Sequence, residues 1–354
     1  PSAARNRNSV PNEGPSGDIE AIWEFSTDGR IMTTPAVDDG MVYFGSEDER
    51  FYAISARTGE ELWHLDVGGI IGGGSPTVHE GRVFFSSGFS RGDLWEGSRD
   101  ARGAVHAVDK ETGDEIWRVE RPEGIQSPPA VNDGTLFHGC QDGNFYALQA
   151  DTGDEIWRFT GATKKFCGNM AAVTEDLLFA GSEDGSLYAL KTEDGARVWE
   201  FETGGMVVSS PAVAEGRVYF LSGDQNLYAV DAESGEEDWR FEMGDDSFSS
   251  PAYRDGVVYV GSADDHLYAV NASTGEMIWF YETNGAIASS PVVTENTIYF
   301  GSNDRSVYAV ENVPTDEETY EEYREKIEQR EQEIQEERYD PDEVEAEIME
   351  RYEQ

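Results

Sequence analysis

The side chains that could bind a ligand are mostly cations in segments that read as loops. Nine cations fall in loops that we expect on one face of the fold, together with one exposed tryptophan. They are Arg30, Arg50, Arg91, Trp95, Arg99, Arg102, Arg121, Lys164, Lys165 and Arg305. Guanidinium and ammonium groups beside an aromatic ring suit an anionic ligand or an acidic partner segment. The alternative is that they pair with nearby acidic residues such as Asp48, Asp142 and Asp184.

Sequence signatures of catalysis are missing from the chain. It contains no P-loop, no H-E-x-x-H, no G-x-S-x-G and no complete EF-hand loop. Cys140 and Cys167 are expected near the same rim, where a metal or redox role is conceivable. Buried thiols are the commoner case, and no histidine stands at metal-ligand spacing from them. We therefore predict no catalytic residue and no metal site.

Composition limits the partners of this 354-residue chain. Its 72 Asp and Glu against 26 Lys and Arg give a formal net charge of −46, which repels nucleic acid and anionic membranes. No apolar run is long enough for a spanning helix, and the first residues are not signal-like. An acid-rich, lysine-poor surface is typical of proteins from salt-loving archaea, because molar salt screens the repulsion between carboxylates.

Internal repeats determine the architecture that we expect. Tryptophan marks a repeat of about 40 residues, with seven copies at Trp23, Trp63, Trp117, Trp157, Trp199, Trp239 and Trp279. Each repeat holds four short β-branched or aromatic runs separated by turn residues, which is the pattern of a four-stranded propeller blade. The interval from Trp63 to Trp117 is longer because residues 89–102 extend the loop between the second and third strands. We predict a seven-bladed, all-β propeller of four-stranded antiparallel blades.

Ring closure is expected to join the two ends of the repeat region. The last repeat supplies three strands and then stops near Pro314, whereas Ala21 to Phe25 matches the outer strand of the other blades. The N-terminal segment should therefore complete blade seven in a one-plus-three closure. The seven tryptophans are expected to dock between neighbouring blades, each burying on the order of 200 Å².

The repeat resembles the tryptophan-docking motif of the pyrroloquinoline quinone (PQQ) propeller superfamily. Copies read AVDKETGDEIW from Ala107, ALQADTGDEIW from Ala147 and AVNASTGEMIW from Ala269. The resemblance covers about residues 21–310, and the chain looks most like short PQQ-like repeat proteins of haloarchaea. The superfamily includes quinoprotein dehydrogenases and also non-catalytic scaffolds, such as the lipoprotein subunit of outer-membrane assembly machines. The resemblance also implies export or attachment to the cell surface.

The chain departs from the quinoprotein enzymes in residues that matter for the cofactor. Those enzymes typically hold the quinone between a channel tryptophan and a disulfide of adjacent cysteines, with calcium bound by Glu, Asn and Asp. Here Cys140 and Cys167 are 27 residues apart, and an eighth blade is missing. We expect no cofactor, and we retain PQQ as the alternative.

The two ends of the chain are expected to be separate elements. Residues 1–18 should form a flexible arm, residues 19–313 the propeller, and residues 314–354 an acidic helical tail. Thr315 and Glu318 form a capping box, and Asp340-Pro341 divides the tail into two helices. Each of these helices has only a narrow apolar stripe and cannot bury it alone. The tail is therefore expected to lie on the propeller, to self-associate or to bind a partner.

Three functional hypotheses remain open at this point. The first is a non-catalytic propeller scaffold that binds proteins through its loops and its tail. The second is a PQQ-dependent or metal-dependent oxidoreductase that uses the central channel. The third is a sensor that binds an anionic ligand at the cationic rim. Because a fold does not by itself give a function, the choice depends on the site.

Overall fold

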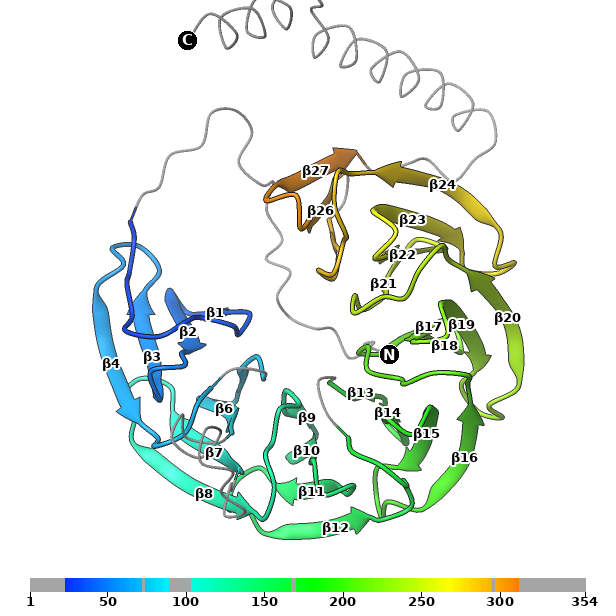
Figure 1. Cartoon of the computed structure of the whole chain (residues 1–354). Helices are drawn as coiled ribbons and strands as arrows, with labels where there is room; N and C mark the ends of the chain where they lie inside the picture. The colour runs from blue at the N-terminus through cyan, green and yellow to red at the C-terminus, as the bar shows by residue number, and fades with distance from the viewer. Residues whose placement is uncertain (1–22, 72–73, 89–102, 167–169, 295–296, 312–354) are drawn as a thin grey trace, which may run out of the picture.

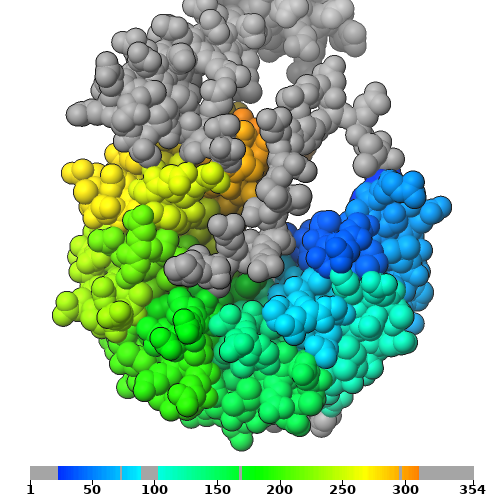
Figure 2. All heavy atoms as spheres, turned by 180° about the vertical axis from the view of Figure 1, so that it is seen from behind, coloured from blue at the N-terminus to red at the C-terminus, as the bar shows by residue number. Residues whose placement is uncertain are grey.

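The computed structural model describes residues 23–71, 74–88, 103–166, 170–294 and 297–311. Every regular element in this part of the chain is a β-strand, and the strands form seven sheets. Figure 1 shows the sheets arranged as blades around a common centre, and Figure 2 shows them from behind as successive sectors of one ring. The predicted seven-bladed propeller is confirmed. The helical tail and the N-terminal arm lie outside the described residues.

The blades follow one another along the chain, and each runs from its innermost to its outermost strand. Blade one contains β1 (Ala36–Asp38), β2 (Met41–Gly45), β3 (Arg50–Ser55) and β4 (Glu61–Asp66). Blade two contains β5 (Thr77–His79), β6 (Arg82–Ser87), β7 (Gly103–Asp109) and β8 (Glu115–Arg121). Blade three contains β9 (Ala130–Asn132), β10 (Thr135–Gly139), β11 (Phe145–Gln149) and β12 (Glu155–Phe159). Blade four contains β13 (Ala172–Val173), β14 (Leu177–Gly181), β15 (Ser186–Lys191) and β16 (Arg197–Glu202).

The remaining blades repeat this order. Blade five contains β17 (Ala212–Ala214), β18 (Arg217–Ser222), β19 (Asn226–Asp231) and β20 (Glu237–Glu242). Blade six contains β21 (Ala252–Arg254), β22 (Val257–Gly261), β23 (His266–Asn271) and β24 (Met277–Glu282). Blade seven contains β25 (Val292–Val293), β26 (Thr297–Gly301) and β27 (Val307–Glu311). All neighbouring strands within a blade pair antiparallel, as in Val218 opposite Val230.

The hydrophobic core lies between the blades. The second and third strands of a blade are buried on both faces, so they read as continuous apolar runs such as RVYFLS in β18. One typical core cluster joins Phe179 and Leu187 of blade four to Val218 and Phe220 of blade five. The outer strands alternate buried and exposed positions because only one of their faces meets the neighbouring blade.

Ring closure differs from the expectation. The sheet of blade seven has three strands, and Trp23 to Phe25 form no strand, although residues 21 and 22 lie outside the described part of the chain. Trp23 and Phe25 nevertheless pack against blade one, where the Trp23 indole N–H donates to the Ala56 carbonyl at 2.9 Å. Val307 of β27 remains 83% exposed. This N-terminal segment is therefore placed by side-chain docking on blade one and not by strand pairing with β27.

Six of the seven repeat tryptophans make the same two contacts with the next blade. Each indole N–H donates to a backbone carbonyl there, at 2.8 to 3.2 Å. Each ring covers a glycine in that blade, where an added Cβ would lie 2.5 to 2.9 Å from the ring or the tryptophan Cβ. Trp199 shows both contacts, with Ala232 as the acceptor and Gly235 under the ring.

Trp279 is the exception among these residues. Its indole nitrogen is buried and has no hydrogen-bond partner within the described part of the chain. The 33-residue interval between Trp199 and Ala232, which recurs between Trp239 and Ala272, would place its acceptor at residue 312. Residue 312 lies outside the described residues.

We predict that two glycine substitutions in blade five separate the indole contact from backbone strain. Gly216 and Gly235 have similar positive φ values of 76° and 72°, but only Gly235 faces an indole. Gly216→Ala should cost about 1 kcal/mol of unfolding free energy for its left-handed backbone. Gly235→Ala should cost about 1 to 3 kcal/mol more, because its methyl group overlaps Trp199. Denaturant unfolding checks both variants, and equal losses would contradict the docking role.

Candidate functional site

The candidate functional site is one face of the ring, which we call the loop face. It is formed by the loops that lead into each innermost strand and by the loops between the second and third strands. Backbone N–H groups of the first kind of loop donate to aspartates of the second kind, as from Gly204 to Asp224 at 2.8 Å and from Gly244 to Asp264 at 2.7 Å. The two kinds of loop therefore lie together, and they join neighbouring blades.

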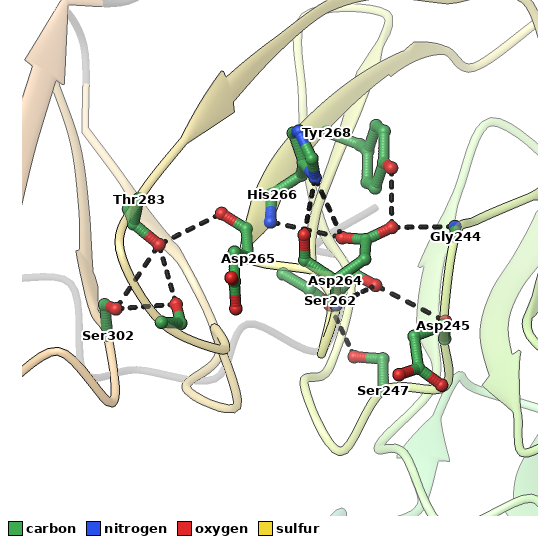
Figure 3. Close-up of polar contacts among 12 residues, drawn as sticks. Gly244, Asp245, Ser247, Ser262, Asp264, Asp265, His266, Tyr268, Thr283 and Ser302 are labelled. Carbon is green, nitrogen blue, oxygen red and sulfur yellow. Dashed lines mark hydrogen bonds and ion pairs between the residues drawn. The ribbon is translucent and has the colours of Figure 1, made fainter.

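An aspartate and a tyrosine four residues apart are bonded on this face in six blades. The tyrosine hydroxyl donates to the carboxylate at 2.6 to 2.9 Å in every pair. The pairs are Asp48–Tyr52, Asp142–Tyr146, Asp184–Tyr188, Asp224–Tyr228, Asp264–Tyr268 and Asp304–Tyr308. Figure 3 shows Asp264 between Tyr268 and the Gly244 N–H. These carboxylates are part of the scaffold, because their oxygens are occupied by donors from the chain itself.

In the pairs of blades five, six and seven, the pKa values of both partners are shifted. Burial alone would raise the pKa of Asp224, but donation from Tyr228, Gly204 and Asn226 holds it below its ordinary value. Donation from Tyr308 is the main reason why the pKa of Asp304 falls to about 2. Burial, followed by the adjacent Asp224, raises the pKa of Tyr228 to about 12. Asp224 therefore stays charged and Tyr228 stays neutral over a wide pH range.

The innermost segments are also joined by hydroxyl groups. Backbone N–H groups donate to the serine hydroxyl of the next blade, from Met170 to Ser210, from Ser210 to Ser250, and from Ser250 to Ser290, each at 2.9 Å. Pro128 stands at the corresponding position of blade three and has no N–H to donate. In blades five, six and seven, the hydroxyls of the innermost segments therefore already serve as acceptors.

The cations predicted on this face have different environments in the structure. Arg50 pairs with Asp66 at 2.9 Å and lies 3.9 Å from Asp28. Arg121 is buried beside Tyr146. The exposed members are Arg30, Lys164, Lys165 and Arg305, whereas Arg91, Trp95, Arg99 and Arg102 lie outside the described residues. The carboxylates of Asp48, Asp142 and Asp184 accept tyrosine hydroxyls.

Exposed apolar side chains share this face with the free cations. Phe248 is 64% exposed and Met32 is 59% exposed, and Met206 and Ile31 are also exposed. All four stand on segments that lead into innermost strands, in blades five, six and one. Sequence analysis missed them because an exposed apolar residue in a loop has no periodic signature. It also missed the aspartate–tyrosine pairs, although their constant spacing of four residues is visible in the sequence.

Among the described residues, the Cys140 thiol and the imidazoles of His106 and His138 are buried and so are not accessible to a substrate. Cys140 is buried between blades two and three, and burial is the main cause that raises its pKa to about 12. Burial, and then the charge of Arg121, lowers the pKa of His138 to about 3. Cys167 lies outside the described residues. The described residues contain no group of three His, Cys, Asp or Glu side chains that could hold a metal ion.

The described residues do not fit the arrangement by which quinoprotein dehydrogenases hold PQQ. Seven tryptophans stand in phase on or before the outermost strands, away from the centre, and the eighth, Trp95, lies outside the described residues. Cys140 is buried with its sulfur 3.8 Å from the Glu123 and Gly124 carbonyl oxygens, and it has no cysteine beside it in the sequence. No helix within the described residues is long and apolar enough to cross a bilayer.

We predict that removal of one tyrosine hydroxyl has a pH-dependent cost. Tyr228→Phe should cost about 1 kcal/mol at pH 7, because Asp224 loses a donor. The lowered pKa of Asp224 stabilises the fold above the ordinary value near 4, and this stabilisation is lost as pH falls through the folded pKa. The cost of the substitution should therefore shrink below about pH 4.

Tyr219→Phe is the matched control for this measurement. The Tyr219 hydroxyl donates to the Ala272 carbonyl at 3.3 Å and touches no carboxylate. Its cost should stay constant over the acidic range when both variants are unfolded by denaturant at several pH values. A Tyr228→Phe cost that is equally constant would contradict the coupling to Asp224.

Comparisons with known proteins agree with this geometry. Residues 17–98 match a family described as outer membrane protein assembly factor BamB. Tetrathionate hydrolase of Acidithiobacillus ferrooxidans is 30% identical over 125 residues, which are 32% of this chain and 25% of that protein. Quinoprotein alcohol dehydrogenase PedH of Pseudomonas putida is 26% identical over 139 residues, 36% of this chain and 22% of that protein. The matched segments thus span about a quarter of these relatives.

A solved structure shows the same fold. The crystal structure of BamB from Moraxella catarrhalis has a TM-score of 0.69 and 20% sequence identity, and the match covers 83% of this chain and 87% of that chain. The family described as "beta-alanine-activating enzyme, beta-propeller" matches residues 97–329, well over half of the sequence. The chain therefore belongs to this family of PQQ-like β-propellers.

Proposed function

We propose that this propeller is a non-catalytic scaffold that binds a partner protein on its loop face. The partner segment would carry apolar side chains flanked by carboxylates. The observation that carries the proposal is the apolar set Phe248, Met32, Met206 and Ile31, exposed on loops of one face. Large apolar side chains gathered on a rim with charged neighbours are typical of a protein-binding surface.

The cations of the same face support an acidic partner segment. Arg30, Lys164, Lys165 and Arg305 are exposed and stand in blades one, four and seven, near the apolar set of blades five, six and one. On the opposite face some cations are paired, as Lys110 is with Asp38 at 2.8 Å and Arg82 is with Asp151 at 2.9 Å, whereas Arg57 and Lys191 are exposed there. Free positive charge on one face of a chain with a net charge of −46 would orient an acidic segment.

The proposal extends to parts of the chain outside the described residues. We propose that the acidic tail, residues 314–354, is a second contact surface that binds a partner or another copy of the chain. We also propose that the chain works outside the cytoplasm, by analogy with a relative named as an outer membrane protein assembly factor. The acidic surface would then be an adaptation to a salt-rich environment.

We predict that a photo-crosslinker on the loop face captures a partner. With the photoreactive residue at position 248, an extract of the producing organism should yield one discrete crosslinked protein. The same residue at position 233, in an exposed turn of the opposite face, is the matched control and should yield none. Lys164→Glu with Lys165→Glu should weaken this interaction about tenfold if carboxylates dock there.

Two outcomes would contradict the scaffold proposal. One is the same crosslinked products from positions 248 and 233, and the other is no product from either position. A third outcome would favour the anionic-ligand sensor. In it, no protein is crosslinked, the unsubstituted chain binds a small anionic metabolite, and the double lysine variant does not bind it.

A PQQ-dependent oxidoreductase is the second candidate function, and the similarity to quinoprotein alcohol dehydrogenases favours it. We predict that titration of the chain with PQQ in molar salt, with and without calcium, shows no saturable change in absorbance. The described residues lack the groups that those enzymes use to hold the cofactor. Stoichiometric binding with dye-linked oxidation of an alcohol or a sugar would replace the scaffold by the enzyme.

A further inference from the structure

The junction between blades two and three departs from the repeat. At five other junctions, an aromatic ring two residues after the docking tryptophan meets the tyrosine ring of the next blade at a steep angle. The centroid distances are 5.2 to 5.7 Å for Phe25–Tyr52, Phe159–Tyr188, Phe201–Tyr228, Phe241–Tyr268 and Tyr281–Tyr308. These contacts are apolar and use the favoured geometry of aromatic pairs.

Two polar groups occupy this place between blades two and three. Val119 stands where the other junctions have an aromatic ring, and Arg121 covers the tyrosine instead, with its Cζ 3.8 Å from the Tyr146 ring centroid. His138 stacks on Tyr146 at 5.1 Å, in the position that Phe220 occupies against Tyr228. At this junction a guanidinium therefore takes the place of the aromatic ring, and an imidazole stands at a position that is Phe220 in blade five and Val260 in blade six.

Atoms of both polar groups are buried without a partner. Only a tenth of the Arg121 side chain is exposed, and its Nε and Nη2 have no hydrogen-bond partner among the described residues. The Nε2 of fully buried His138 has none either, while its Nδ1 lies 3.3 Å from the Gly139 carbonyl oxygen. Buried donors of a charged group are costly when unpaired, so this arrangement needs an acceptor from elsewhere.

The carboxylates near this junction are already shared. Glu155 lies 3.7 Å from Nη1 of Arg121 and also pairs with Arg158 at 3.2 Å, so one negative charge faces two positive ones. Asp142 accepts the Tyr146 hydroxyl at 2.6 Å and the Asn144 N–H at 2.9 Å. Among the described residues, these carboxylates therefore leave the Nε and Nη2 donors of Arg121 without an acceptor.

We propose that the junction between blades two and three binds a small carboxylate, which Arg121 holds through Nε and Nη2. These two donors form the side edge of the guanidinium, where both oxygens of a carboxylate accept parallel hydrogen bonds. Glu155 takes the remaining nitrogen, which leaves this edge for the ligand. The small exposed fraction of Arg121 restricts the ligand to an acid of a few atoms. The site is separate from the apolar set on the loop face.

Acetate is the probe for this site. Thermal unfolding of the full chain is followed while sodium acetate replaces sodium chloride at constant ionic strength. We expect a saturable rise of the unfolding midpoint of about 3 °C, because a ligand of the folded state stabilises it. In protein labelled at arginine nitrogen, the Arg121 Nε–H resonance should shift over the same concentrations. An unchanged midpoint and an unchanged resonance would show that water alone occupies the junction and would overturn the proposal.

Substitutions test whether Arg121 is the residue that binds acetate. Arg121→Leu should abolish both responses. If this variant fails to fold, Val119→Phe with Arg121→Thr and His138→Phe restores the residues that blade four and blade five use at their junction, and this triple variant should fold without an acetate response. Arg217→Leu removes an arginine that is paired with Asp238 at 2.7 Å, so it should keep the response. An acetate response in the triple variant would overturn the proposal.

Discussion

The contact of a tryptophan indole with a glycine of the next blade is the interaction on which the ring depends. Each blade is a small antiparallel sheet that cannot bury its own faces, so stability comes from the surfaces between blades. The indole covers a site where no side chain fits, and its N–H fixes the angle of approach through one carbonyl. Shape and hydrogen bonding thus set the same blade-to-blade geometry six times.

The same logic explains why so many reactive groups on the loop face are unavailable for chemistry. Each paired aspartate accepts a tyrosine hydroxyl from its own blade, and most also accept a backbone N–H from the blade before it. Such an aspartate carries charge, but its carboxylate oxygens already accept hydrogen bonds from the scaffold. Among the described residues, the exposed groups of this face include cations and apolar side chains, which suit recognition better than catalysis.

Most of the fold could be predicted from the sequence because the repeat carries it. Tryptophan spacing, turn residues and short β-branched runs give the number of blades and the strands in each of them. Ring closure was harder, because residues 21–25 resemble an outer strand, while the contacts of Trp23 and Phe25 are all with blade one. The same sequence motif is compatible with docking and with strand pairing, so the motif alone does not predict which of the two is formed.

The candidate site was less predictable, since its residues are exceptions to the repeat. Arg121 was grouped with the loop cations, yet it is the last residue of β8, and its guanidinium covers Tyr146 where Val119 replaces an aromatic ring. Whether an arginine at the end of a strand is exposed depends on the size of a residue two positions before it and on the next blade. Repetition offers a reference for such exceptions, because five other junctions show the same aromatic contact. The junction between blades two and three has a buried guanidinium and a neutral imidazole. It lacks the aromatic contact that Phe201 makes with Tyr228 between blades four and five. In a repeat protein, a local loss of this kind points to a bound ligand more directly than charge or exposure does.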